Sequence, residues 1–224
     1  MVSAVIAAAG SGTRIGFKKQ FADLRGMPVL AYSLRAFQNS VVDEIVVVTA
    51  EEDTATVREI AEKYSISKLK SVVKGGKTRS ESVMNGLSAV SGDYVLIHDG
   101  ARPFIESKEI DELTDEVIRT KAAALGYPVV DTIKQVSDGW IEKTIPRETL
   151  MAAATPQGFE TKLITEAHKK AIEDGALLTD DCSAAEYCGH RVKMLSCRDI
   201  NIKITTAKDI IFAEAVLEAS DADR

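Results

Sequence analysis

Short apolar runs and helical patterns alternate along most of this sequence. The apolar runs lie at residues 2–9, 43–50, 70–76, 93–103 (continuing into a polar loop) and 122–130, and the helical patterns lie at 28–38, 52–64, 78–90 and 106–119. Continuous apolar runs of this length are typical of strands buried in a parallel sheet. The alternation therefore predicts an α/β protein with a Rossmann-like, mostly parallel sheet flanked by helices on both faces.

The rhythm changes after residue 130. Residues 131–150 alternate polar and β-branched side chains around Ser137-Asp138-Gly139, a strong signal for a β-hairpin. We expect a β-arm here, at about residues 131–155, inserted between core strands. Helices at about 160–174 and 182–188, a strand at 191–196, the segment NIKITT at 201–206 and a last helix from about 207 to 219 follow. Without an internal repeat or a linker, residues 1–224 are expected to form a single domain.

The charge balance limits where an anionic ligand can bind. The formal net charge of −6 does not favour nucleic acid as a partner, so a site for a polyanion has to be local. The opening stretch is a candidate, because Arg14, Lys18 and Lys19 precede the first acidic residue, Asp23.

The cysteines and the apolar runs indicate the cellular compartment of the protein. Three cysteines without a CxxC pair argue against a disulfide framework or a structural zinc site and fit a reducing compartment. The N-terminal apolar run has no basic leader, and no apolar stretch approaches the length of a membrane span. We therefore expect a cytoplasmic protein without a membrane partner.

The first apolar run opens into a glycine-rich loop, AVIAAAGSGTRIGFKKQ at residues 4–20. A P-loop is excluded because it needs four residues between its glycines and then Gly-Lys-Ser/Thr. A dinucleotide turn of an oxidoreductase is disfavoured because Gly10, Gly12 and Gly16 have the spacing GxGxxxG, and the second strand ends too late to supply the usual acidic residue. The remaining interpretation is a nucleotidyltransferase loop, whose backbone amides approach a triphosphate that arginine and lysine hold.

Two more charged loops, GGKTRSES and HDGARP, also follow predicted strands. Open α/β sheets bind ligands at the carboxyl ends of their strands. We therefore expect all three loops to meet at one edge of the sheet, which favours a binding site over an isolated structural turn.

Seven segments together resemble one enzyme family. They are AAAGSGTRIGFKKQF, KGGKTRSESV, VLIHDGARPF, PVVDTIK, ATPQGF, TDDCSAAEYCG and NIKITTAKDI. In this order, and over essentially the whole chain, they resemble the 2-C-methyl-D-erythritol 4-phosphate cytidylyltransferases of the non-mevalonate isoprenoid pathway.

Two alternatives to this resemblance stay open. Ribitol-5-phosphate cytidylyltransferases share the scaffold and several motifs, although TDDCSAAEYCG is more similar to the methylerythritol enzymes. A non-catalytic nucleotide-binding protein on the same fold is more remote, because it would typically have lost Arg14, Lys19 or Lys203, which are all present.

The resemblance implies transfer of CMP from CTP to 2-C-methyl-D-erythritol 4-phosphate, giving CDP-methylerythritol and pyrophosphate. A phosphate oxygen of this sugar-alcohol phosphate attacks the α-phosphorus of CTP in line with the departing pyrophosphate. Because the attacking phosphate is already largely a dianion near neutral pH, no strong general base is required. The protein has to position two mutually repelling anions and neutralise the charge that develops.

The resemblance also implies roles at the nucleotide. Arg14 and Lys19 would stabilise the transition state, although the segment between them is shorter than usual and Lys18 replaces a common proline, so Lys18 is an alternative to Lys19. Backbone groups of Ala8, Ala9, Gly10 and Gly12 would line the phosphates and part of the nucleotide. Backbone at Gly76 and Lys77 and the side chain of Ser82 would contact cytosine.

At the acceptor, the resemblance places Asp99, Arg102 and Thr132 around the sugar phosphate. Arg147 and Lys203 would orient the attacking phosphate, since arginine can bind phosphate oxygens in two places. In the family the arm embraces a second subunit, so the resemblance implies a homodimer in which Arg147 completes the neighbour's site.

The implied cofactor is Mg²⁺, held mainly by the phosphates of CTP and by water, with no protein ligand assigned. Asp99 and Asp209 are the acidic residues expected nearest to it. Of the three histidines, His98 is expected to be an oriented structural group, while His168 and His190 are expected at the surface.

Overall fold

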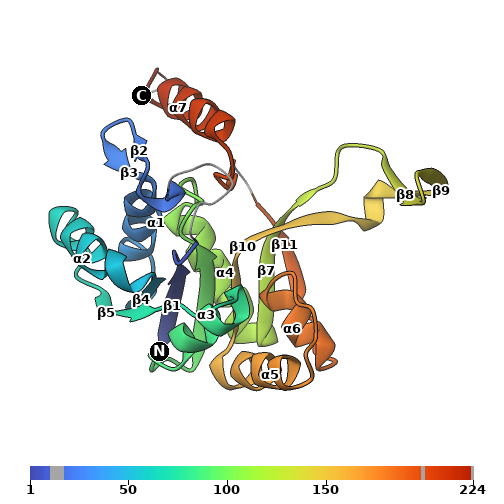
Figure 1. The fold of residues 1–224 in the computed structure, drawn as a ribbon, viewed down its shortest axis with the longest axis horizontal. Helices are drawn as coiled ribbons and strands as arrows, with labels where there is room; N and C mark the ends of the chain where they lie inside the picture. Colours follow the sequence, from blue (N-terminus) through green and yellow to red (C-terminus); the bar gives the residue numbers. More distant parts are fainter. Residues whose placement is uncertain (11–17, 198–199, 223–224) are drawn as a thin grey trace.

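Figure 1 shows a computed structural model of the chain, which describes residues 1–10, 18–197 and 200–222. Within these residues a seven-stranded sheet has the order β11-β7-β10-β6-β1-β4-β5. The strands are β1 (Val2–Ala7), β4 (Glu44–Thr49), β5 (Leu69–Lys74), β6 (Tyr94–Asp99), β7 (Ala122–Pro128), β10 (Met151–Glu160) and β11 (Lys193–Ser196). All neighbouring pairs are parallel except those of β10, which is antiparallel to β6 and to β7. The expected mostly parallel sheet is confirmed.

The central strands are apolar on both sides because helices cover both faces of the sheet. In β1, Ala4 and Ile6 pack into one core cluster and Val5 into the other. In β6, Leu96 and Ile97 divide in the same way. This two-sided burial is what the continuous apolar runs in the sequence predicted.

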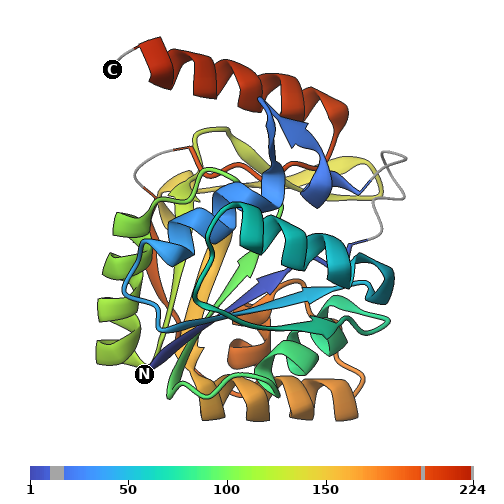
Figure 2. The same ribbon diagram turned by 90° about the vertical axis from the view of Figure 1, so that its left-hand side faces the viewer.

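Helices α1, α2 and α4 contribute to the core cluster on one face, and α3, α5 and α6 to the cluster on the other (Figure 2). Their bounds are α1 (Val29–Gln38), α2 (Thr54–Lys63), α3 (Arg79–Leu87), α4 (Ser107–Thr120), α5 (Thr161–Glu173) and α6 (Asp181–Tyr187). Helix α7 (Ala207–Ala222) lies beside the small β2–β3 ribbon (Asp23–Leu24 and Met27–Pro28), where Ala213 packs with Leu24. None of the helices in the described ranges is long and apolar enough to cross a membrane.

Two helix starts differ in detail from the sequence pattern. Pro28 precedes α1 as its cap and pairs in β3, instead of occupying the first helical position. At α3, Thr78 accepts the amide of Glu81, which is one half of a capping box. The Glu81 carboxylate, however, accepts the amide of Lys77 at 2.7 Å. It thereby holds the turn before the helix.

The predicted hairpin is present as β8 (Ile133–Ser137) and β9 (Trp140–Ile145), and it projects away from the sheet (Figure 1). The turn uses positive φ at Asp138 and Gly139, as its sequence requires. Strand β10 begins at Met151, inside the range expected for the arm, and continues to Glu160 in the sheet. The sequence pattern does not predict a core strand here, because these residues show neither alternation nor a long continuous apolar run.

Candidate active site

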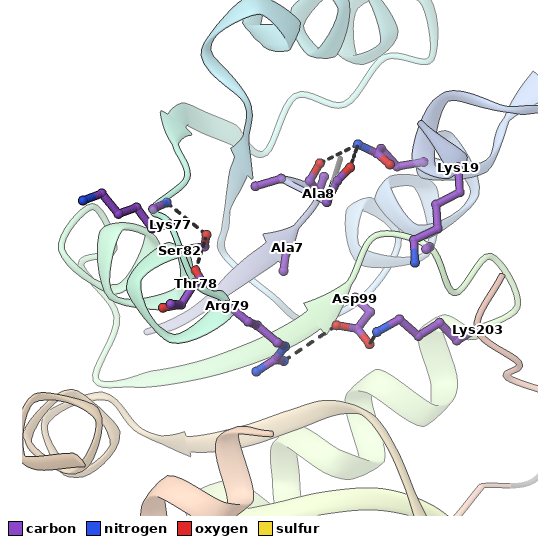
Figure 3. A pocket seen from close by; sticks show the side chains of 14 residues that line it. Ala7, Ala8, Lys19, Lys77, Thr78, Arg79, Ser82, Asp99 and Lys203 are labelled. Carbon is purple, nitrogen blue, oxygen red and sulfur yellow. Dashed lines mark hydrogen bonds and ion pairs between the residues drawn. The ribbon is translucent and has the colours of Figure 1, made fainter. Parts of the chain in front are cut away.

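A cavity of about 450 Å³ lies at the carboxyl ends of β1, β5 and β6, where the three charged loops meet. Figure 3 shows the Arg79 and Lys203 side chains reaching toward Asp99 from opposite sides, while the ammonium group of Lys77 points away. The lining residues are Ala7, Ala8, Ala9, Gly10, Lys19, Gln20, Gly76, Lys77, Thr78, Arg79, Ser82, Asp99, Ala101 and Lys203.

The start of the glycine-rich loop is clamped by Gln20. This buried side chain lies on a short 3-10 turn, η1 (Lys19–Phe21), and its Nε2 donates to Ala8 O at 2.8 Å and to Gly10 O at 3.1 Å. Ala8 N donates to Val48 O at 2.7 Å, which joins the same backbone to β4. Because η1 is tied to the end of β1, the neighbouring Lys19 lies at the cavity.

The adjacent lysines have different surroundings. Lys18 Nζ lies 2.7 Å from Asp53 Oδ2 and 3.0 Å from Glu52 Oε1, on the turn η2 (Glu51–Asp53) that precedes α2. Hydrogen bonds to these carboxylates raise the pKa of Lys18. Lys18 therefore pairs with two carboxylates that do not line the cavity, whereas Lys19 lines the cavity.

The turn before α3 is built around Ser82. Its hydroxyl donates to Thr78 O at 2.9 Å and accepts from Gly76 N at 3.0 Å. A Cβ at Gly76 would lie 2.3 Å from Glu81 Cβ, so only glycine fits this turn without a shift. Since the hydroxyl proton is engaged with Thr78, the oxygen can only accept a further hydrogen bond.

Asp99 is the single carboxylate among the described residues that line the cavity. Its Oδ2 lies 2.8 Å from Lys203 Nζ and 3.6 Å from Arg102 Nε, and its Oδ1 lies 3.7 Å from Arg79 Nη2. Burial by itself would raise the pKa of Asp99, but the charges of Lys203 and Arg79 hold this pKa well below its usual range. Asp99 is thus ionised and organises three cations.

The guanidinium of Arg79 forms a bidentate pair with Asp181 at the start of α6. Nη1 lies 2.8 Å from Oδ1 and Nη2 lies 2.6 Å from Oδ2. Asp181 is fully buried, and Nε2 of the buried His168 lies 3.0 Å from its Oδ1. Although burial opposes ionisation, the neighbouring Arg79 charge lowers the pKa of Asp181. A series of contacts from His168 through Asp181 to Arg79 therefore connects α5 with the cavity.

A second cavity of about 270 Å³ shares Arg79, Asp99 and Lys203 with the first. Its other lining residues are Arg102, Ala153, Ala154, Thr155, Gln157, Thr179 and Asp180. The two cavities meet at the shared charged residues, so the arrangement can hold two anionic groups next to each other.

The buried side chain of His98 holds the HDGARP loop by a hydrogen bond to the loop backbone. A carbonyl only accepts, so His98 Nε2 donates to Arg102 O at 3.2 Å and Nδ1 accepts from Thr155 Oγ1 at 3.1 Å. Thr155 Oγ1 in turn accepts from Asp99 N at 3.0 Å. Burial lowers the pKa of His98 to about 4, so the ring is neutral near pH 7. This geometry agrees with the expectation of an oriented structural group.

The sequence model of one protein family, described as IspD: 2-C-methyl-D-erythritol 4-phosphate cytidylyltransferase, matches residues 2–219. The chain belongs to this family. The 2-C-methyl-D-erythritol 4-phosphate cytidylyltransferase of Halalkalibacterium halodurans is 46% identical over 219 residues, and that of Clostridium novyi is 44% identical over 221 residues; each match covers 96% of both chains. The chain is accordingly an enzyme of the nucleotidyltransferase class.

Solved structures of the family have the same fold. The 4-diphosphocytidyl-2C-methyl-D-erythritol synthase of Anaerococcus prevotii superposes with a TM-score of 0.89 at 32% identity and covers 97% of this chain and 96% of its own. The 2-C-methyl-D-erythritol 4-phosphate cytidylyltransferase of Thermus thermophilus gives 0.79 at 29% identity, over 96% and 98%.

Most of the expected site residues of this family member lie together. Ala8, Ala9, Gly10, Lys19, Gly76, Lys77, Ser82, Asp99 and Lys203 line the first cavity, and Arg102 lines the second. Thr132 and Arg147 are exposed near the base of the arm and line neither cavity. Gly12 and Arg14 lie outside the described residues.

Three residues that shape the cavities are not predicted from the sequence. Arg79 lies within the GGKTRSES loop, where no motif assigns it a role, and no local pattern indicates the contacts of Asp181 and Gln20. The surface position expected for His168 is wrong, because its side chain is fully buried against Asp181. Helical spacing could have revealed this, since His168 shares a face of α5 with the buried Ile164 and Ala171.

The described residues do not form a protein cage for a metal ion, since no cluster of three or more histidine, cysteine, aspartate or glutamate side chains suited to a metal occurs among them. Asp209 accepts the amides of Thr205 and Thr206 at the start of α7 and lines neither cavity. Among the described residues, Asp99, already paired with Lys203, is the one carboxylate that lines the first cavity, and Asp180 joins it in the lining of the second.

Proposed function

We propose that this enzyme transfers CMP from CTP to 2-C-methyl-D-erythritol 4-phosphate and releases pyrophosphate. One observation carries the proposal: in a chain of net charge −6, the described lining of the main cavity gathers Lys19, Arg79 and Lys203 around one carboxylate, Asp99. A local surplus of fixed positive charge favours a polyphosphate ligand. Membership of the family supports CTP and the methylerythritol phosphate as the substrates.

The proposed chemistry is an in-line displacement at the α-phosphorus of CTP. An oxygen of the acceptor phosphate forms the new P–O bond while the bond to the β-phosphate oxygen breaks, and pyrophosphate leaves with that electron pair. Lys19, and Arg14 by resemblance, would stabilise the charge on the transferring group. Lys203, held at 2.8 Å from Asp99, would orient the attacking phosphate.

The turn around Ser82 supports cytosine as the base. The Ser82 oxygen can only accept a further hydrogen bond, and the exocyclic amino group of cytosine is a donor. Uracil presents a carbonyl oxygen at that position, which would face another acceptor. The backbone of Gly76 and Lys77 lines the same end of the cavity.

The second cavity is proposed to hold the sugar-alcohol phosphate. Arg102 and Lys203 supply positive charge for the phosphate, and Asp99 supplies a carboxylate for a hydroxyl group. Because Asp99 and Lys203 also line the CTP cavity, the acceptor phosphate would lie directly beside the triphosphate.

Mg²⁺ is proposed to enter with CTP and to be held mainly by its phosphates and by water. The donor set fits this arrangement, because Asp99 is the only described carboxylate lining the main cavity and is already paired with Lys203. When bound, the cation would neutralise phosphate charge.

The β-arm is proposed to join two copies of the chain. Its exposed apolar side chains support this, with Trp140 79% and Ile141 65% exposed in the single chain. Thr132 and Arg147, which line neither cavity of their own chain, would then reach the site of the second copy.

The test is pyrophosphate release with CTP, Mg²⁺ and 2-C-methyl-D-erythritol 4-phosphate, with ribitol 5-phosphate in parallel. Release with the methylerythritol phosphate alone is expected. Release only with ribitol phosphate would keep the chemistry and change the acceptor. If protein that is folded by circular dichroism releases no pyrophosphate with either acceptor, the proposal is overturned.

A further inference from the structure

Arg79 stands at the boundary between the two cavities and lines both of them. Its side chain is 32% exposed, and Figure 3 shows the guanidinium reaching into the cavity toward Asp99. On its buried side the fork with Asp181 has distances of 2.8 and 2.6 Å, while the nearest oxygen of Asp99 stays at 3.7 Å. The guanidinium is therefore bound to one carboxylate and held just short of another.

The fork leaves hydrogen-bonding capacity for a ligand. A guanidinium carries five N–H donors in a fixed plane, and the two bonds to Asp181 use two of them. The fork does not use the other three N–H groups, and the Arg79 side chain lines both cavities. Phosphate oxygens match this planar geometry, which a lysine ammonium cannot reproduce.

Asp181 is itself fixed in place. Its amide and that of Cys182 donate to Gln157 Oε1 at 2.9 and 3.0 Å, and His168 Nε2 lies 3.0 Å from its Oδ1. The carboxylate lies in the first turn of α6, where a negative charge is favoured. Because these contacts fix the Asp181 carboxylate, it determines where the Arg79 guanidinium lies.

We propose that Arg79 is a further substrate-binding residue whose guanidinium donates to the phosphate of the sugar-alcohol acceptor at the boundary with the CTP cavity, and that Asp181 is its positioning residue. The proposal rests on the function proposed above. Two anions must approach each other for the transfer, and a cation shared by their two cavities reduces the repulsion between them.

Asp181 keeps Arg79 from pairing with Asp99, which is the other carboxylate near the guanidinium. Without the Asp181 charge, Arg79 can close the 3.7 Å gap and pair with Asp99. Asp99 would then be drawn away from Lys203, to which it is bound at 2.8 Å. The loss would fall on the acceptor, since the turn at Gly76 and Ser82 that faces the base is held by its own hydrogen bonds.

The experiment compares steady-state kinetics of the wild type, Arg79→Lys and Asp181→Asn, with the KM of each substrate measured separately. Arg119→Lys is the matched control, because Arg119 pairs with Glu116 on the surface of α4 and lines neither cavity. Arg79→Lys is expected to lower kcat/KM for the acceptor by ~10–100-fold and to change the KM of CTP by less than about threefold. Asp181→Asn is expected to show the same split, and Arg119→Lys to match the wild type.

Equal losses for both substrates, or no loss, would overturn the proposal. If Asp181→Asn does not fold by circular dichroism, Asp181→Glu, which keeps the charge but displaces the fork, is expected to show the same split. Calorimetric titration with inorganic phosphate is the readout without turnover: Arg79→Lys should bind it more weakly than Arg119→Lys. If the wild type is inactive with both acceptors, the proposed function fails, and this titration still decides the anion-binding role of Arg79.

Discussion

Lys203 Nζ lies 2.8 Å from Asp99 Oδ2, so the segment before the last helix is tied to the carboxyl end of the central strand β6. This pair brings a cation from late in the chain to the boundary of both cavities. The distance predicts that Lys203 matters for the reaction as well as for the fold.

Replacing Lys203 by alanine is expected to lower kcat/KM for the acceptor by about 100-fold, because one charged contact with a phosphate is lost. The matched control is Lys208→Ala on the exposed side of α7, which should retain wild-type rates. Pyrophosphate release measures both variants. A wild-type rate for Lys203→Ala would contradict the assignment.

The two adjacent lysines should behave differently. Lys19→Ala is expected to reduce turnover by about 100-fold, because Lys19 lines the larger cavity, which we propose binds CTP. Lys18→Ala should leave turnover within a few-fold of the wild type, because Lys18 pairs with Asp53 and Glu52. The reverse order of effects in the same assay would assign the triphosphate to Lys18.

Gln20→Glu tests the clamp at the glycine-rich loop. A carboxylate in this buried position would face the carbonyl oxygens of Ala8 and Gly10 with no proton to donate. We expect a loss of about 2–3 kcal/mol in the free energy of unfolding, measured with urea, and a higher KM for CTP. Gln38→Glu, on the partly exposed side of α1, is the control and should change neither quantity appreciably.

His98 makes stability depend on pH. The pKa of the buried ring is lowered from 6.5 to about 4, so between these values the unfolded chain binds a proton that the folded chain does not. The free energy of unfolding should therefore fall as the pH drops through this window, by up to about 3 kcal/mol from this group. Urea denaturation of the wild type and of His98→Gln at several pH values isolates the effect. The difference in stability between them should shrink toward pH 4; a constant difference would exclude His98 as the cause.

The arm should control assembly. Replacing Trp140 and Ile141 by serine is expected to shift the protein from dimer to monomer in sedimentation velocity, because both side chains are exposed in the single chain. Turnover should fall with the dimer if Thr132 and Arg147 act in the neighbouring site. Val41→Ser, at an exposed apolar residue away from the arm, should leave the sedimentation unchanged. A wild type that sediments as a monomer would remove the basis of this prediction.

The alternation of strands and helices was predictable because each inner strand is buried on both sides. Strand β10 was not, because Thr155, Pro156 and Gln157 interrupt its apolar residues. Its position between β6 and β7 comes from pairing with residues distant in the sequence. Local patterns do not carry that information.

The cavity residues were predictable where a motif lies at the carboxyl end of a strand, as for Asp99 at the end of β6 and Gly76 just after β5. The pairing of Arg79 with Asp181 depends on the packing of α6 near α3, which no spacing in the sequence specifies. Sequence likewise could not decide between Lys18 and Lys19. That choice depends on where the carboxylates of η2 lie in space.

Strand β10 has one further consequence. It continues from Met151, beside the root of the arm, to Glu160 in the sheet, but its register with β7 shifts between Ala153 and Gln157. Thr155, which lines the smaller cavity, lies inside this irregular stretch. Movement of the arm would therefore reach Thr155, which bonds to His98 and to the amide of Asp99, through a stretch of β10 without regular pairing to β7.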